Sequence, residues 1–220
     1  SYEDSFRYVA DPRVSNVPVK DLLSKKYANE RRSLISSNKA IKDVSFGNPN
    51  GNSDTVYLSV IDGAGNACSF INSLFSGFGT GLVVPETGIA LQNRGSLFSM
   101  DPEHPNYLEG NKRPYQTIIP AMATKNEELW LSFGVMGGFQ QPQGQLQVIS
   151  NMVDHNMDSQ EALDSLRFSV DVDENRHVLV ESDLDQEVVK GLRAKGHDVT
   201  VVKGYDRILS CGRQIISTDS

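Results

Sequence analysis

A change in the spacing of apolar residues at Thr55 constrains the fold of this chain more than any other feature of its sequence. From Thr55 to Ile61 the side chains alternate with the period of two that is typical of a β-strand. Residues 62–66, Asp-Gly-Ala-Gly-Asn, form a hairpin-turn signal, and residues 67–73 continue as a second strand-like run. The sequence therefore predicts an antiparallel β-hairpin that begins at Thr55.

The segment before Thr55 has a different character. Its charged residues avoid one helical face, which holds Leu22, Leu23, Tyr27, Leu34 and Ile35. Residues 47–53 are Gly, Asn, Pro and Ser, a composition that predicts an exposed, flexible loop of the kind at which chains are cut. We therefore expect two parts, residues 1–54 and residues 55–220, that meet at a cleavable loop.

The rest of the chain mixes strands and helices. Residues 88–93 predict a short strand, and residues 95–114 predict a long irregular connection, which in a compact domain is often functional. The elements expected beyond it are a hairpin at 116–124 and 129–136, a helix after Gly137–Gly138 with Leu146, Ile149, Met152 and Val153 on one face, a short helix capped by Asp158 or Ser159, strands at 177–181, 199–202 and 208–216, and a helix at 184–195 that ends at Gly196. Hairpins with segregated helices predict an α+β fold or a layered αββα sandwich.

Composition argues against several classes of function. The formal net charge of -7 argues against nucleic acid as a partner, since phosphate binding needs clustered Lys and Arg. No run of about 18 apolar residues occurs, so we expect no membrane span, and the acidic first residues are unlike a signal peptide. The two cysteines, Cys68 and Cys211, are expected to be buried thiols, with neither a disulfide framework nor a metal site. The sequence does not decide between a cytoplasmic and a periplasmic or secreted protein.

Two features could carry chemistry. Thr55 lies where a flexible loop meets a strand, and Gly137–Gly138 lie between an apolar strand and the start of a helix. Adjacent glycines at a helix amino terminus can present main-chain N–H groups to a developing negative charge, as an oxyanion hole does. From the residues alone, a plain strand threonine and a plain strand-to-helix turn are the simpler interpretations, because Thr favours strands in any case.

A longer set of motifs keeps one register over residues 55–195. The motifs are Thr-x-x-x-Ser-Val-Ile-Asp-x-x-Gly-Asn from Thr55, Phe-Gly-Thr-Gly from Phe78, Gly-Ile-x-Leu-x-Asn from Gly88, Lys-Arg-Pro from Lys112, and Gly137–Gly138. Together they resemble the small subunit of the γ-glutamyltransferase (γ-glutamyltranspeptidase) family of N-terminal-nucleophile hydrolases. Residues 1–54 resemble the end of the large subunit. The resemblance implies a four-layer αββα sandwich and a longer precursor in which several hundred residues precede this chain.

The resemblance also implies a mechanism. The precursor cuts itself when the hydroxyl of Thr55 attacks the carbonyl of Asp54, and the freed α-amine of Thr55 then acts as base for its own hydroxyl. An acyl-enzyme forms on Thr55 and passes to water or to an amine. By position, Ser73 matches a hydroxyl that hydrogen-bonds the nucleophile, and Gly137 and Gly138 match the oxyanion-hole amides. The implied partners are a small-molecule amide substrate and the large subunit of the same precursor, with no cofactor and no metal.

Five positions depart from the transpeptidase pattern and bear on the substrate. Phe75 stands where the transpeptidases carry an Asn that helps bind the glutamyl group. Arg94 and Leu97 occupy key places in the segment that binds the substrate's α-amine, and Gln116 and Thr117 replace paired serines that hold its α-carboxylate. Because an acid is lost at 97 and a cation is added at 94, we expect an acyl donor other than glutamyl, with a carboxylate or carbonyl facing Arg94. The cephalosporin-acylase-like and oxamate-amidohydrolase-like branch of the family is similar in this respect.

A second interpretation stays open at this stage. The chain could be a catalytically inactive or unprocessed relative that acts as a structural or binding module, and its unbroken run through Asp54–Thr55 favours that interpretation. A precursor would look the same. The two interpretations predict different fates for the peptide bond before Thr55.

Overall fold

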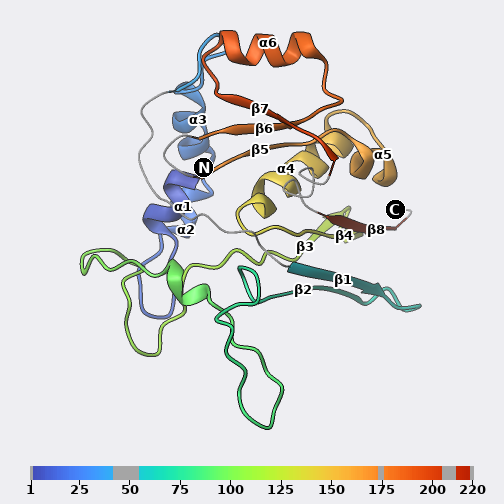
Figure 1. Cartoon of the computed structure of the whole chain (residues 1–220). Helices are drawn as coiled ribbons and strands as arrows, with labels where there is room; N and C mark the ends of the chain where they lie inside the picture. Colours follow the sequence, from blue (N-terminus) through green and yellow to red (C-terminus); the bar gives the residue numbers. More distant parts are fainter. Residues whose placement is uncertain (1, 42–54, 173–175, 205–211, 219–220) are drawn as a thin grey trace.

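The computed structural model describes residues 2–41, 55–172, 176–204 and 212–218 (Figure 1). These residues form helices and three β-sheets, so the predicted α+β class is confirmed. Within these ranges no helix combines the length and the apolar character that a membrane crossing requires. Asp54 and Cys211 lie outside the described residues.

The first sheet is the predicted antiparallel hairpin of β1 (Thr55–Ile61) and β2 (Ala67–Ser73). Its register pairs Thr55 with Ser73 at the open end. The carboxylate of Asp62 closes the turn, because it accepts bonds from two main-chain N–H groups of the turn, both at 2.9 Å. The hairpin thus fixes the first residue of β1 opposite the last residue of β2.

The two faces of the hairpin have different surroundings. Odd-numbered side chains such as Tyr57 and Ile71 are buried. Even-numbered side chains on the other face are exposed and mostly apolar: Val56, Leu58, Val60, Cys68 and Phe70. The prediction of a buried Cys68 is therefore wrong, because the strand register turns its thiol outwards. An apolar outer face of this kind is a surface suited to another layer of protein.

The second sheet has the strand order β3–β4–β8 and packs between the hairpin and two helices (Figure 1). Its strands are β3 (Ala121–Lys125), β4 (Glu128–Val135) and β8 (Arg213–Ser217), and the helices are α4 (Gln140–Val153) and α5 (Ser159–Asp164). The buried core between sheet and helices includes Leu131, Phe133 and Val148. Hairpin, sheet and helices make a β, β, α order, so described residues supply three layers of the expected sandwich.

Gly134 and Tyr57 meet where the two sheets stack. A Cβ atom at position 134 would lie 2.3 Å from Cδ2 of Tyr57, so the ring needs a glycine beneath it. Two residues further along the hairpin, the Ser59 hydroxyl donates to Oγ of Ser132 at 2.6 Å. These two contacts set the alignment of β1 on β4.

α4 begins after the glycine pair as predicted, but its buried face differs from the prediction. Val148 is fully buried and packs with Ile149 and Met152 against the second sheet, whereas Leu146 and Val153 are exposed. The buried face also includes Gln141 and Gly144. Because neither is a large apolar residue, the spacing of such residues identified only part of the buried face, Ile149 and Met152.

The third sheet has the order β5–β6–β7 and carries α6 (Gln186–Ala194) as the crossover between its parallel strands. The strands are β5 (Phe168–Val170), which the sequence did not predict, β6 (Val178–Glu181) and β7 (Val199–Val202). Two predicted helix ends are confirmed here: Asp158 caps α5, and Gly196, with φ of 94°, follows the C-cap of α6. The last predicted strand, 208–216, falls partly outside the described residues.

The N-terminal segment forms three short helices, α1 (Tyr2–Tyr8), α2 (Val19–Leu22) and α3 (Lys25–Ser33). The Oγ of Ser24 accepts a bond from the N–H of Tyr27 and so starts a new helix where one continuous face was expected. The prediction of a packed apolar face fails there, since the exposed residues include Leu23, Leu34 and Ile35.

The connection from β2 to β3 is long and irregular, as predicted, and extends away from the sheets (Figure 1). It contains one 3₁₀ turn, η1 (Arg94–Leu97), within the described residues. The strand predicted at 88–93 is wrong: only an isolated bridge between Val83 and Ala90 occurs there. One bridge is not enough to make residues 88–93 a strand, which needs several consecutive pairs with a neighbouring strand.

Candidate active site

Thr55 and Ser73 face each other across the open end of the hairpin. The Thr55 hydroxyl donates to Oγ of Ser73 at 3.2 Å, and the main-chain N–H of Phe75 donates to the same oxygen at 2.9 Å. Both side chains are half-buried. The Ser73 hydroxyl therefore orients the Thr55 hydroxyl and is itself held by the backbone just beyond β2.

The stacking of the two sheets brings Thr55 towards the glycine pair. The step from Ser59 back to Tyr57 along β1 matches the step from Ser132 forward to Gly134 along β4. Beyond these contacts, β1 begins two residues earlier at Thr55, and β4 ends at Val135, shortly before Gly137. The two features that the sequence singled out thus lie at the same end of the stacked sheets.

Gly137 and Gly138 make the turn between β4 and α4. Their φ angles are 119° and 54°, in the left-handed region that favours glycine. The N-cap residue of α4, Phe139, makes no side-chain capping bond. The turn therefore leads into a helix amino terminus, where the helix dipole favours negative charge.

Arg94 is a buried cation close to this end of the hairpin. The residue is 2% exposed, and its guanidinium carbon lies 4.9 Å from the centre of the Phe75 ring. Its Nη1 donates to Oγ1 of Thr117 at 2.6 Å. Its Nη2 is buried without a hydrogen-bond partner among the described residues. Burial lowers the pKa of Arg94, because the uncompensated charge is costly away from water. An anionic or carbonyl oxygen at Nη2 would relieve that cost.

The backbone around Arg94 is braced by Asn93. The Asn93 side chain accepts a bond from the N–H of Ser76 at 3.0 Å and donates to the carbonyl of Gly79 at 3.1 Å. Its main-chain N–H donates to the carbonyl of Leu74 at 3.1 Å. These bonds tie the start of η1 to the segment that follows β2, and so keep Arg94 beside Phe75.

Phe75 itself has an unusual backbone. Its φ is 82° although it carries a large ring, and the ring is buried. This conformation costs of the order of 1 kcal/mol for a non-glycine residue. The same conformation allows two contacts: the main-chain N–H of Phe75 donates a hydrogen bond to Ser73, and the Phe75 ring lies beneath Arg94.

Two of the predicted substrate residues are less closely connected. Leu97 ends the same 3₁₀ turn as Arg94 and is half-buried, and its carbonyl accepts a bond from the side chain of Asn106 at 2.7 Å. Gln116 is exposed, unlike its neighbour Thr117. Among the described residues, no recorded contact joins the side chain of Leu97 or Gln116 to Arg94.

An aromatic cluster, which sequence reasoning missed, surrounds the residue that follows the glycine pair. We define it as Tyr2, Phe6, Phe75, Tyr115 and Phe139. The ring of Phe139 lies 5.5 to 6.4 Å from each of the other four, measured between ring centres. The members come from distant parts of the sequence, so no local pattern could have revealed the cluster.

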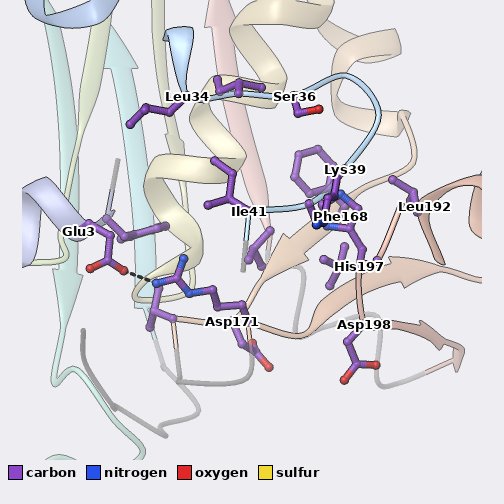
Figure 2. A pocket seen from close by; sticks show the side chains of 18 of the residues that line it. Glu3, Leu34, Ser36, Lys39, Ile41, Phe168, Asp171, Leu192, His197 and Asp198 are labelled. Atoms are coloured by element: carbon purple, nitrogen blue, oxygen red, sulfur yellow. Dashed lines mark hydrogen bonds and ion pairs between the residues drawn. The ribbon is translucent and has the colours of Figure 1, made fainter. Parts of the chain in front are cut away.

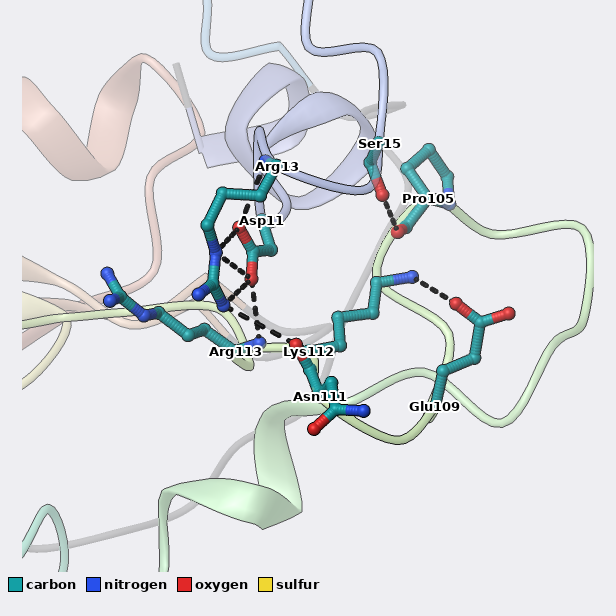
Figure 3. Close-up of polar contacts among 8 residues, drawn as sticks. All are labelled: Asp11, Arg13, Ser15, Pro105, Glu109, Asn111, Lys112 and Arg113. Carbon is teal, nitrogen blue, oxygen red and sulfur yellow. Dashed lines mark hydrogen bonds and ion pairs between the residues drawn. The ribbon is translucent and has the colours of Figure 1, made fainter.

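A second set of contacts ties the N-terminal segment to the connection between β2 and β3 (Figure 3). The buried carboxylate of Asp11 accepts from Nε of Arg13 at 2.9 Å and from the main-chain N–H of Arg113 at 3.0 Å. The Ser15 hydroxyl donates to the carbonyl of Pro105 at 2.8 Å. The bonds from Arg13 and Arg113 hold the pKa of Asp11 well below its usual range. The main chain of the Lys-Arg-Pro motif thus helps to tie this connection to the N-terminal segment.

A cavity of about 1370 Å³ lies between α1, the segment after α3, and the third sheet with α6 (Figure 2). Apolar side chains such as Ile41 and Leu192 line it, and an ion pair of 2.5 Å joins Glu3 to Arg176 in its wall. None of the site residues predicted from the sequence lines this cavity. It therefore plays no part in the chemistry considered below.

In the described parts of the chain, no group of three or more His, Cys, Asp or Glu side chains could hold a metal ion.

The fold defines the class of protein. The hairpin starts at a threonine, stacks on a second sheet, and has helices beyond that sheet, which is the arrangement of an α+β protein of the N-terminal-nucleophile hydrolase type. The chain belongs to the γ-glutamyltranspeptidase family, whose sequence model matches residues 1–219.

Sequence similarity to relatives of known name extends over most of this chain. It is 38% identical over 212 residues to the glutathione hydrolase-like YwrD proenzyme of Bacillus subtilis, and 32% identical over 212 residues to the oxamate amidohydrolase proenzyme of Klebsiella pneumoniae. Each match covers 95% of the chain but 40% of the relative. The crystal structure of a cephalosporin acylase from Bacillus halodurans superimposes with a TM-score of 0.88 at 43% identity, covering 99% of this chain and 39% of that one. The chain thus spans about two fifths of the length of these relatives.

Proposed function

We propose that the protein to which this chain belongs is a Thr-dependent amide hydrolase or acyltransferase, whose nucleophile Thr55 is released by self-cleavage. The hydrogen bond from the Thr55 hydroxyl to Ser73 at the start of β1 is the observation that carries the proposal. The relatives are named as hydrolases, acylases and an amidohydrolase, each a proenzyme, which supports an enzyme over a non-catalytic module.

Self-cleavage divides the chain into residues 1–54 and residues 55–220. The Thr55 oxygen attacks the carbonyl carbon of Asp54, the C–N bond breaks, and the nitrogen becomes the free α-amine of Thr55. Water then hydrolyses the resulting ester and leaves Asp54 with a carboxylate. The first of these steps needs a hydroxyl on the residue after the bond, which Thr55 supplies.

In turnover, the α-amine of Thr55 takes the proton of its own hydroxyl as the oxygen attacks the substrate amide. An α-amine has a pKa of about 8, so its unprotonated form is available near neutral pH. The acyl group forms an ester with Thr55, and the amine of the substrate leaves with a proton. Water or an acceptor amine then releases the acyl group. Ser73 orients the nucleophile throughout, since its Oγ accepts the Thr55 hydrogen bond.

The glycine pair is proposed to stabilise the negative oxygen of the tetrahedral intermediate. The stacking of Tyr57 on Gly134 supports this proposal, since Thr55 and the glycine pair each lie a few residues beyond that contact towards the same end of the sheets. The glycine backbone can turn its N–H groups towards the reacting carbonyl. The amino terminus of α4 adds positive potential at the same place.

The acyl donor is proposed to carry a carboxylate or carbonyl that binds Arg94, and to lack the α-ammonium of a glutamyl group. The buried Nη2 of Arg94 has no partner in the described structure, while Phe75 and Thr117 hold the guanidinium in place. Since an ammonium next to this cation would be repelled, a dicarboxylic acid monoamide fits better.

The partner is proposed to be the large-subunit part of the same precursor. The outer face of the hairpin exposes Val56, Leu58, Val60 and Phe70, and relatives with this family's fold are longer than this chain. Helices from that part would complete the αββα sandwich.

Variants at Thr55 test the nucleophile in the full-length protein. Thr55→Ala should abolish cleavage and lower amide turnover by at least about 1,000-fold, because no side-chain oxygen remains. Thr55→Ser keeps the hydroxyl and should keep part of both. A denaturing gel with intact mass detects a fragment that begins at Thr55. Amide turnover that survives Thr55→Ala would rule out this nucleophile, and an uncut wild type that ignores all amides would favour the binding-module alternative.

Variants at Arg94 test the acyl donor. The wild type should hydrolyse a glutaryl anilide in preference to a γ-glutamyl anilide, and Arg94→Ala should raise KM for the glutaryl anilide about 10- to 100-fold, the worth of a charge-assisted hydrogen bond. Arg113→Ala is the matched control, since Arg113 lies in the same connection but is exposed. A strong preference for the glutamyl compound would refute this part of the proposal.

A further inference from the structure

The aromatic cluster joins the N-terminal segment to the glycine pair. Tyr2 and Phe6 lie on α1, before the proposed cleavage point, and both rings contact Phe139. The Phe6 ring also lies 5.5 Å from that of Tyr115, and the Ser5 hydroxyl lies 3.0 Å from the Tyr115 hydroxyl. Helix α1 therefore packs directly on the residue that follows Gly138.

A hydrogen bond accompanies this packing of aromatic rings. The phenol hydroxyl of Tyr2 donates a hydrogen bond to the main-chain carbonyl of Phe139. This carbonyl belongs to the N-cap residue of α4, one residue after the glycine pair. Burial raises the pKa of Tyr2, so the phenol stays protonated and remains a donor over the working range of pH.

The turn has few restraints of its own. The main-chain N–H groups of Gln140 and Gln141 donate to the carbonyls of the two glycines at 2.9 and 3.1 Å. The glycines have no side chains to limit their backbone, and Phe139 has no side-chain capping bond at the start of the helix. The Tyr2 hydroxyl and the stacked rings therefore add a restraint from outside the turn.

We propose that Tyr2 is a positioning residue for the oxyanion-binding turn, acting through the carbonyl of Phe139. This inference rests on the proposed function of Gly137 and Gly138. It means that the N-terminal segment, although a separate polypeptide after cleavage, sets the geometry in which the transition state is bound. The same ring of Phe139 packs on Phe75, beneath Arg94, so the cluster also links the turn to the donor site.

The test compares Tyr2→Phe with Tyr8→Phe in the full-length protein. Tyr2→Phe removes the hydroxyl and keeps the ring, while Tyr8→Phe removes a hydroxyl from an exposed tyrosine on the same helix. Oxyanion donors act on the transition state more than on the bound substrate. Tyr2→Phe should therefore lower kcat about tenfold with KM changed less than twofold, in line with a small displacement of a catalytic group. Tyr8→Phe should match the wild type in both.

A second measurement is independent of turnover. Hydrogen–deuterium exchange of the main-chain amides at 137–142 should be faster in Tyr2→Phe than in wild type or Tyr8→Phe. The positioning role would be overturned if exchange at 137–142 or kcat were unchanged in Tyr2→Phe. It would also be overturned if kcat fell together with a rise in KM and a fall in melting temperature, as for a general loss of structure. If the wild type hydrolyses no amide, the proposed function fails, and the exchange result alone decides whether Tyr2 holds the turn.

Discussion

At the scale of single residues, the contact between Gly134 and Tyr57 controls how the two sheets stack. Gly134→Ala would place a Cβ atom within 2.3 to 2.8 Å of three ring atoms of Tyr57, and the ring cannot move away without separating the sheets. We expect the free energy of unfolding to fall by about 1–3 kcal/mol, as for other overpacked cores. Urea unfolding measures the change. Gly110→Ala is the control, because a Cβ atom there meets nothing within 4 Å; an equal effect of the two changes would contradict the stacking argument.

At the scale of elements, the sequence predicts what local chemistry decides and fails where distant contacts decide. The hairpin of β1 and β2, the cap at Asp158 and the C-terminal glycine at Gly196 were all predictable, since each depends on residues close together in the chain. The full buried face of α4 was not, because it includes Gly144, which packs against Val135 of β4.

The candidate site follows the same division. Thr55 and Ser73 are brought together by the hairpin register, which the turn sequence already implies. The bond from Arg94 to Thr117 and the rings around Phe139 join segments more than twenty residues apart. No period or turn signal encodes such contacts, so only the folded chain reveals them.

At the scale of the whole molecule, Asp11 is expected to hold the N-terminal segment in a pH-dependent way. Its folded-state pKa lies well below the unfolded value of about 3.9, so its stabilising effect is complete above about pH 5 and declines as the pH falls towards the folded-state pKa. Asp11→Asn should therefore weaken the protein at pH 7 and weaken it less at pH 3, where part of the effect is already lost. Urea midpoints at both pH values measure the difference.

Ser15→Ala provides the control for this prediction. It removes the neighbouring hydrogen bond to Pro105 and no titratable group, so its effect should be similar at the two pH values. A difference between Asp11→Asn and wild type that stays constant down to pH 3 would show that the carboxylate charge is not what holds the segment.

The left-handed backbone of Phe75 has a consequence for how substrate preference can change within the family. Asparagine, which the transpeptidases are expected to carry at this position, adopts φ near +60° more readily than other side chains do. An exchange between Asn and Phe can thus leave the main chain in place and keep the hydrogen bond from its N–H to Ser73. The same exchange replaces a polar side chain with an aromatic ring on which Arg94 packs. On the proposed function, donor selection and support of the nucleophile are then separable at one residue, and a change of acyl donor at this position leaves the start of β1 and its bond to Ser73 in place.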